Sequence, residues 1–237
     1  MVVKPSLSHV NVLRLIGLLL FVSCTVTSVW AADTERAAKF YEDGLVRFKK
    51  NDVDGAIIQL KNALQQDNRL LAAHVLLGRA LLRSGNVPAA EAAFNDALRL
   101  GVSRSEVLAP LGRIYLLLGQ PKMVIEKITP DGLPAVAKVE ILSIRGLAYA
   151  DIGNYPLASR AFEDARSIDP SSVVPLLAEI PILLTQGQTE RARFLADRAI
   201  ALAPTNADAW NMSASVAHST LDLRTALDRY GKALDPS

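Results

Sequence analysis

Few side chains in this sequence could act as nucleophiles, bases or metal ligands, and those few are scattered. The 237 residues include one cysteine, Cys24, and three histidines, His9, His74 and His218. Zinc and catalytic sites need such residues at short, recognisable spacings, such as HExxH or GxSxG, and no such motif occurs. A single cysteine also excludes an intramolecular disulfide framework. We therefore predict a protein that is not an enzyme and that uses neither a metal nor another cofactor.

Cys24 has a different potential chemistry, because it follows an apolar segment near the N-terminus. Lys4 and Arg14 form a positively charged start, and the run LIGLLLFV (15–22) follows them. This is the layout of a secretory signal, and the run is shorter than the roughly 20 apolar residues of a membrane-spanning helix. The N-terminal segment therefore predicts export, with a retained anchor helix as the alternative.

Two alternative cleavage sites fit the sequence of this signal. The residues VWA (29–31) suit the general signal peptidase, which would remove residues 1–31. The residues FVSC (21–24) instead resemble a bacterial lipobox, in which case the signal ends at residue 23 and Cys24 becomes the lipid-bearing first residue. In either case membrane contact is predicted only through the signal or the lipid anchor.

The charge of the remaining chain is balanced. Lys4 and Arg14 belong to the signal, and without them 24 basic residues face 24 acidic ones. Proteins that bind nucleic acid usually carry a clear basic excess. The composition therefore predicts no nucleic-acid partner.

A repeat of 34 residues organises the rest of the sequence. Its clearest marker is a glycine, at Gly44, Gly78, Gly112 and Gly146. Sixteen positions after each glycine comes a large apolar residue, at Leu60, Phe94, Ile128 and Phe162. Six units therefore begin near residues 37, 71, 105, 139, 173 and 207, and we predict one array over residues 32–237.

Each unit has the pattern of two amphipathic helices joined by a turn. In the second unit, AHVLLGRALLRSG ends at Gly85 and VPAAEAAFNDALRLG ends at Gly101, and glycine is favoured just past a helix end. Pro170 and Pro204 separate later units, because proline disfavours a continuing helix. One such unit cannot bury its own apolar face, so neighbouring units must stack.

The period and its marker residues resemble the tetratricopeptide repeat family. The matching positions include Leu77-Gly78, Tyr115, Ala158, Phe162 and Trp210. The resemblance implies an all-α solenoid of about six repeats, wound as a right-handed superhelix, with the first helix of each unit lining a concave face.

The same resemblance implies which side chains face the groove. The partner-binding positions expected from it are Tyr41, Phe48, Lys49, Arg79, Arg83, Arg113, Leu147 and Asn211. Arg79 and Arg113 occupy equivalent positions in adjacent units and could bind carboxylates of a peptide or an anionic polysaccharide. The alternative is that they are simply solvated. The Lys and Asn positions of the carboxylate clamp found in chaperone-binding family members are absent, which argues against a chaperone tail as partner.

Three departures from the pattern are visible. The third unit carries the turn signal TPDG (129–132), so its second helix should end near Ile128. Pro181 lies inside the first helix of the fifth unit and should distort that helix without ending it. The sixth unit has no capping helix after it, so Leu227, Tyr230 and Leu234 are either exposed, covered by a partner, or followed by further repeats in a longer protein.

Three segments carry a narrower resemblance: AIIQLKNALQQDN, ALRLGVSRSEVLAPLGRIYLLLGQ and ITPDGLP. With the export signal, they are similar to the repeat proteins, often lipoproteins, encoded with exosortase and PEP-CTERM sorting systems of Gram-negative bacteria. This implies an exported scaffold, in the periplasm or on an envelope membrane, for PEP-CTERM protein sorting or exopolysaccharide assembly. Two alternatives are a glycan-contacting subunit of a polysaccharide export machine and the repeat portion of a larger envelope enzyme.

Overall fold

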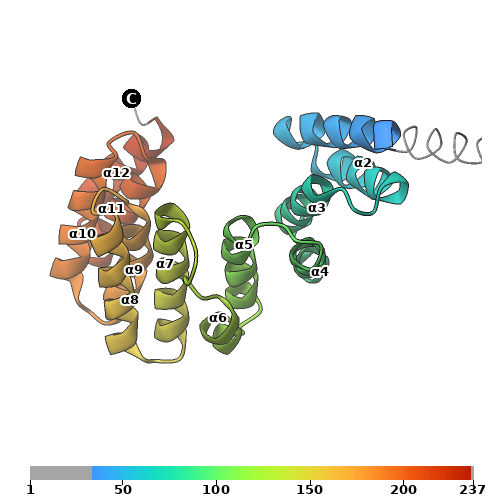
Figure 1. Ribbon diagram of the computed structural model, residues 1–237. Helices are drawn as coiled ribbons and strands as arrows, with labels where there is room; N and C mark the ends of the chain where they lie inside the picture. Colours follow the sequence, from blue (N-terminus) through green and yellow to red (C-terminus); the bar gives the residue numbers. More distant parts are fainter. Residues whose placement is uncertain (1–33, 236–237) are drawn as a thin grey trace, which may run out of the picture. The chain divides into compact units, whose positions relative to one another are not determined.

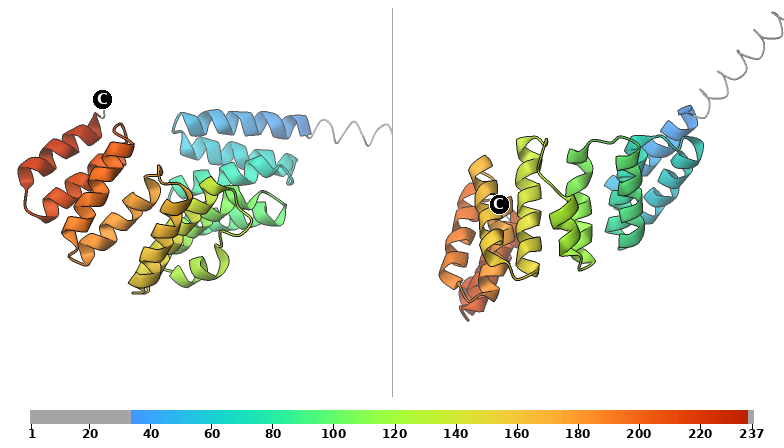
Figure 2. Two further views of the ribbon diagram at one scale, coloured as in Figure 1. Left: turned by 60° about the vertical axis from the view of Figure 1, so that its left-hand side comes forward. Right: turned by 60° about the horizontal axis from the view of Figure 1, so that its bottom comes forward.

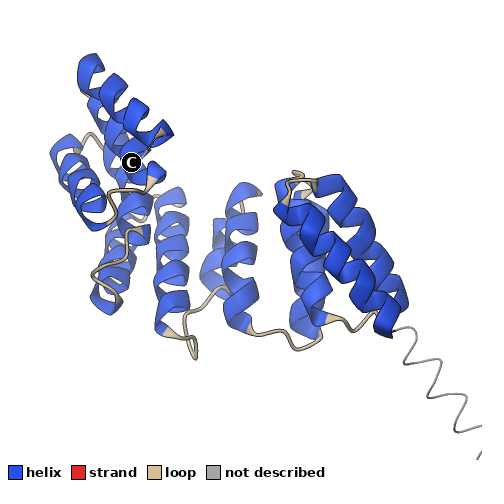
Figure 3. Cartoon of the chain, turned by 90° about the horizontal axis from the view of Figure 1, so that it is seen from above, coloured by secondary structure: helices blue, strands red, loops and turns tan. Residues whose placement is uncertain are grey.

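The regular structure of the chain consists of α-helices. The computed structural model describes residues 34–235, and within them every regular element is a helix and no strand occurs (Figures 1 and 3). The chain divides into two compact units, with unit 1 ending at Gly101 and unit 2 beginning at Val102. The predicted all-α tetratricopeptide-type fold is confirmed.

Unit 1 holds two helix pairs. The described part of its first helix covers residues 34–49, and the other helices are α2 (Val53–Gln66), α3 (Leu71–Arg83) and α4 (Val87–Arg99). α3 packs against both α2 and α4. The pairs thus share a core through α3, as expected of stacked repeats.

Unit 2 holds four helix pairs. They are α5 (Arg104–Leu117) with α6 (Pro121–Lys127), α7 (Ala135–Asp151) with α8 (Tyr155–Ile168), α9 (Val174–Thr185) with α10 (Thr189–Leu202), and α11 (Ala207–Ser219) with α12 (Leu223–Leu234). Each first helix packs against its own second helix and against the first helix of the next pair, from α5 to α11. Each second helix except α12 also contacts the first helix that follows it (Figure 2).

Asparagine and aspartate side chains begin many of the second helices. Asn86 and Asn154 accept hydrogen bonds from the backbone N–H groups of Ala89 and Leu157, three residues into α4 and α8. Asp52 and Asp222 do the same for α2 and α12. These N-caps satisfy donors that a helix leaves without an intrahelical partner, so the turn inside each pair is encoded locally.

The repeated glycine allows the two helices of a pair to approach closely. A Cβ atom added to Gly78 would lie 2.9 Å from the Phe94 ring, and one added to Gly146 would lie 2.5 Å from Cε1 of Phe162. Both phenylalanines are fully buried. A small residue on the first helix therefore accommodates a large one on the second, and the core is filled without strain.

The fifth repeat inverts this arrangement. In the 34-residue frame, Ile180 stands where the earlier repeats have glycine, and Ala196 stands where they have Leu, Phe or Ile. Both are completely buried in one core cluster with Leu176, Leu183 and Ala199. The large and small partners have exchanged helices, so the pair keeps its total side-chain volume.

The third repeat has a short second helix, as the turn signal predicts. α6 has seven residues and is capped by Ile128. The Arg145 guanidinium of α7 donates to the Ile125 and Ile128 carbonyls at 2.7 and 3.0 Å. These are carbonyls of the last turn, which otherwise lack donors, and a cation there also suits the helix dipole. α7 is 17 residues long and compensates for the short α6, so the 34-residue period is kept.

The loop after α6 is held by a second arginine. Arg104, at the start of α5, donates to the Thr129 hydroxyl at 3.0 Å and to the Asp131 carbonyl at 3.3 Å.

α9 continues through Pro181 to Thr185, so the expectation that this proline does not end the helix is confirmed. Leu227, Tyr230 and Leu234 of α12 are exposed.

Among residues 34–235, none of the helices has the length and apolar character that crossing a membrane requires.

The turn inside each repeat contains one residue in the left-handed backbone conformation. Four repeats use glycine there (Gly85, Gly119, Gly153 and Gly187), the first uses Asn51 (φ 63°), and the sixth uses Leu221 (φ 60°). A leucine in this conformation is strained, whereas asparagine tolerates it.

Replacing Leu221 with asparagine is expected to raise the free energy of unfolding by about 0.5–1 kcal/mol. The Leu221 side chain is 81% exposed, so the change removes little packing. Chemical denaturation measures the gain, and the reciprocal change Asn51→Leu should lower stability. An unchanged or lower stability of Leu221→Asn would contradict the strain argument.

Candidate partner-binding site

The first helix of unit 1 and α3 meet through an aromatic and a cationic side chain. Arg83 lies over the Phe48 ring, 4.1 Å from its centroid, and its Nη1 donates to the Phe48 carbonyl at 3.3 Å. A guanidinium on an aromatic face is held by the ring quadrupole and keeps its remaining N–H groups available. Tyr41 lies seven residues before Phe48, on the same helical face, and is half-buried.

Two exposed cations flank this contact. Arg79 is one helical turn before Arg83 on α3, and Lys49 follows Phe48 in the first helix. We call these five residues (Tyr41, Phe48, Lys49, Arg79 and Arg83) the first-helix surface of unit 1. It combines apolar rings with positive charge, which suits a peptide that presents carboxylates.

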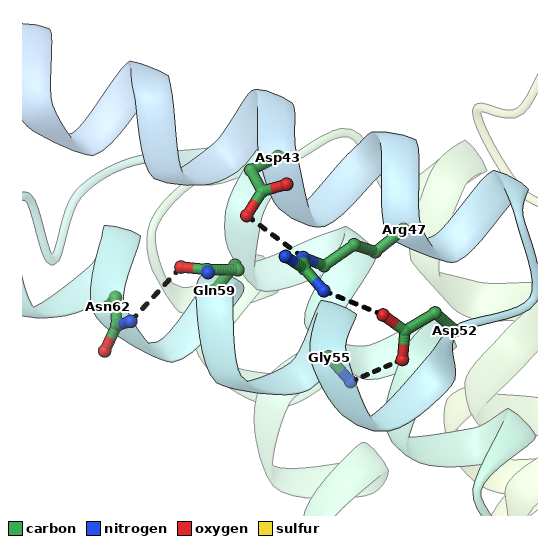
Figure 4. A network of polar contacts seen from close by, with 6 residues as sticks. All are labelled: Asp43, Arg47, Asp52, Gly55, Gln59 and Asn62. Atoms are coloured by element: carbon green, nitrogen blue, oxygen red, sulfur yellow. Dashed lines mark hydrogen bonds and ion pairs between the residues drawn. The ribbon is translucent and has the colours of Figure 1, made fainter.

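A polar network fixes the end of the first helix beside this surface. Arg47 pairs with Asp43 at 3.0 Å and with Asp52 at 2.9 Å, and Asp52 also caps α2 by accepting from the Gly55 N–H (Figure 4). The hydrogen bond from Arg47, together with that from Gly55, lowers the pKa of Asp52. The network therefore joins the first helix to α2 through a carboxylate that stays ionised.

In unit 2 the predicted groove cation is paired. Arg113 Nη2 of α5 lies 2.7 Å from Glu140 Oε1 of α7. Leu147 of α7 and Asn211 of α11 are half-buried. An ion pair therefore joins these two adjacent first helices. Because of this pairing, Arg113 is less available for a ligand than Arg79.

The structure places the predicted residues in separate groups. Tyr41, Phe48, Lys49, Arg79 and Arg83 belong to unit 1, and Arg113, Leu147 and Asn211 belong to unit 2. Cys24, the predicted lipidation site, lies outside the described residues. In the described part of the chain, His, Cys, Asp and Glu side chains form no group of three or more that could hold a metal ion.

The sequence interpretation missed a buried acid in α9. The Glu179 side chain is only 4% exposed, and its carboxylate lies 2.5 Å from Nη1 of Arg166 and 3.7 Å from Nη2 of Arg191. These arginines come from α8 and α10. Glu179 therefore pairs with the second helix of the preceding repeat and with the second helix of its own repeat. The signal was present in the sequence, because Glu179 is the one charged residue in the helix VPLLAEIPILLT.

The fold and its exposed first-helix residues define a class, the helical-repeat proteins of tetratricopeptide type. Residues 47–114 match the family model described as tetratricopeptide repeat. This match covers the first repeats of the chain, and the helix pairs that follow have the same type of fold.

Solved structures share this fold. A tetratricopeptide repeat protein from Parabacteroides merdae ATCC 43184 is similar with a TM-score of 0.59 and 20% identity, over 86% of this chain and 80% of that one. PilW, described as a widely conserved type IV pilus biogenesis factor, is similar with a TM-score of 0.65 and 14% identity, over 83% and 91%. At these identities the likeness concerns the fold alone.

One curated relative is similar in sequence. The human protein O-mannosyl-transferase TMTC1 is 28% identical over 124 residues, which cover 52% of this chain. The same alignment spans 14% of that relative's length.

Proposed function

We propose that this protein is an exported scaffold that binds protein partners in the cell envelope of a Gram-negative bacterium and catalyses no reaction. The observation that carries the binding part is the first-helix surface of unit 1, where two exposed cations flank the stacked Phe48 and Arg83. Such a surface can accept an extended peptide by placing its carboxylates on the guanidinium groups.

Export is supported by the basic start and apolar run of residues 1–31. The resemblance to repeat proteins of exosortase systems supports a role in PEP-CTERM protein sorting or exopolysaccharide assembly. The lipobox-like FVSC (21–24) supports a lipid on Cys24. The intact mass of the mature protein tests this last point, because a mature chain that starts at Ala32 would exclude the lipid anchor.

Affinity capture from the native envelope, followed by mass spectrometry, tests the binding surface. The double variant Arg79→Glu/Arg83→Glu is expected to reduce recovery of the main partner at least ~10-fold, because two charge-assisted hydrogen bonds are lost. Lys61→Glu/Arg99→Glu is the matched control, since it makes the same charge change on α2 and α4. Equal recovery by both double variants, or no reproducible partner, would refute the proposal.

A second candidate is that these repeats serve an enzyme as its partner-binding portion. The similarity to TMTC1, whose name describes a transferase, favours it. Capture of a glycosyl-transferring activity with the wild-type repeats, and its loss with Arg79→Glu/Arg83→Glu, would support this candidate over the free scaffold. Recovery of polysaccharide alone would instead favour the glycan-contacting alternative.

A further inference from the structure

Unit 2 contains a second surface with the features of a binding site, lined by none of the predicted groove residues. A cavity of about 420 Å³ lies among α8, α9 and α10. Its walls include Arg166, Glu179, Arg191, Phe194, Leu195 and Arg198. The cavity thus brings three guanidinium groups and an exposed aromatic ring together.

The buried acid fixes the position of the arginines. Glu179 is 4% exposed and accepts a hydrogen bond from Arg166, whose side chain is 17% exposed, while Arg191 lies 3.7 Å from the other carboxylate oxygen. A guanidinium has five N–H donors, and this carboxylate uses only some of them. Arg191 Nη1 also donates to the Gln188 side chain at 2.7 Å. Glu179 and Gln188 thus hold this guanidinium at the wall, and its other N–H groups can meet a ligand.

Three residues of α10 share one face at this cavity. Arg191, Phe194 and Arg198 are spaced by three and four residues, which places them side by side on a helix. Phe194 is 66% exposed, whereas the next residue, Leu195, is buried and Ile200 is half-buried. An exposed ring between two guanidiniums offers apolar contact and carboxylate recognition within one short segment.

The charges around the cavity favour an anionic ligand. Glu179 is compensated by Arg166, and the other wall acid, Glu190, lies 3.7 Å from Arg193 of its own helix. The wall thus has three arginines against two acids, and Arg198 makes one long hydrogen bond, of 3.4 Å, to the Pro170 carbonyl. The net local charge is therefore positive beside an apolar ring and the Leu195 side chain.

We propose that this cavity binds an acidic peptide segment in which a large apolar side chain stands next to a carboxylate. The apolar side chain packs on Phe194 and Leu195, and the carboxylate accepts hydrogen bonds from Arg191 and Arg198. An anionic polysaccharide would satisfy the arginines but has no apolar side chain to place on Phe194. The peptide is thus the occupant that uses both features.

Fluorescence anisotropy with two labelled probes tests the proposal. One is a 12-residue Glu-rich peptide with a central Leu-Glu-Phe, and the other has every Glu replaced by Gln. The acidic probe should bind, and Arg191→Gln/Arg198→Gln should weaken its binding at least ~10-fold, since each charge-assisted hydrogen bond contributes strongly. Phe194→Ala should weaken it about fivefold or more, as for an interface anchor.

The controls separate this site from general charge and from the first-helix surface of unit 1. Arg160→Gln/Arg224→Gln removes two exposed arginines of α8 and α12 and should leave binding unchanged. Arg79→Glu/Arg83→Glu is measured in the same assay: a loss of binding in this variant with none in Arg191→Gln/Arg198→Gln would place the probe on the first-helix surface of unit 1, so failure of the proposed function and failure of this inference give different results. Thermal unfolding checks that each variant is folded.

Three results would overturn the inference. The first is equal binding of the acidic and neutral probes. The second is full binding by both the Arg191→Gln/Arg198→Gln and Phe194→Ala variants. The third is binding of a polygalacturonate oligosaccharide, lost in the arginine variant, when the acidic peptide does not bind.

Discussion

Replacing Glu179 with alanine is expected to lower the free energy of unfolding by about 3 kcal/mol, because it leaves the Arg166 guanidinium without its partner in a mostly buried place. Arg166 comes from α8 and Glu179 from α9, so the lost pair also joins two neighbouring repeats. Urea denaturation followed by circular dichroism measures the change. An effect below about 1 kcal/mol would show that water reaches Arg166 and replaces the acid.

Two further variants distinguish loss of the pair from loss of volume. Arg166→Met/Glu179→Leu removes both charges at similar size and is expected to be close to the wild type in stability. Asp228→Ala breaks an exposed pair with Lys232 in α12 and should change stability by less than about 1 kcal/mol. If the double variant were as unstable as Glu179→Ala, packing and not the unpaired charge would explain the loss.

Replacing Ile180 with glycine is expected to lower the free energy of unfolding by about 4 kcal/mol. Ile180 is completely buried in the core of the α9–α10 pair, so the change leaves a cavity and adds a glycine inside a helix. Ala196→Phe alone should also destabilise, by about 1–3 kcal/mol, because no space exists for the ring. Denaturant unfolding of both single variants gives the two reference values.

The double variant Ile180→Gly/Ala196→Phe is the decisive measurement. It recreates the arrangement of Gly146 and Phe162 in the preceding repeat, and at least half of the summed loss should be recovered. Ala201→Phe, at an exposed position of α10, serves as the control for adding a ring. Strictly additive losses would mean that Ile180 and Ala196 do not share one packing site.

The helix pairs could be predicted from the sequence because their signals are local. Apolar spacing, the glycines just past helix ends and the prolines between repeats each act within a few residues, and the turn signal after Ile128 correctly placed the end of α6. The 34-residue period also identified the fifth repeat. The exchange of Ile180 and Ala196 could be interpreted only once the structure placed both side chains in one core.

The side-chain contacts between repeats could not be predicted in the same way. Arg113 was assigned to the groove, yet its pairing with Glu140 depends on how α5 lies against α7. Arg145 reaches carbonyls 17 and 20 residues earlier, and Glu179 finds its arginines on two other helices. Such contacts follow from rotamers and helix packing, which a 34-residue pattern does not specify.

The packing of unit 2 has a consequence for the way it folds. Every contact between its described helices joins members of the same repeat or of consecutive repeats, so no pairing waits for a distant part of the chain. Such low contact order is typical of rapid folding, because little loop entropy is lost before contacts form. Each helix pair of unit 2 can therefore dock on the one before it without waiting for later repeats.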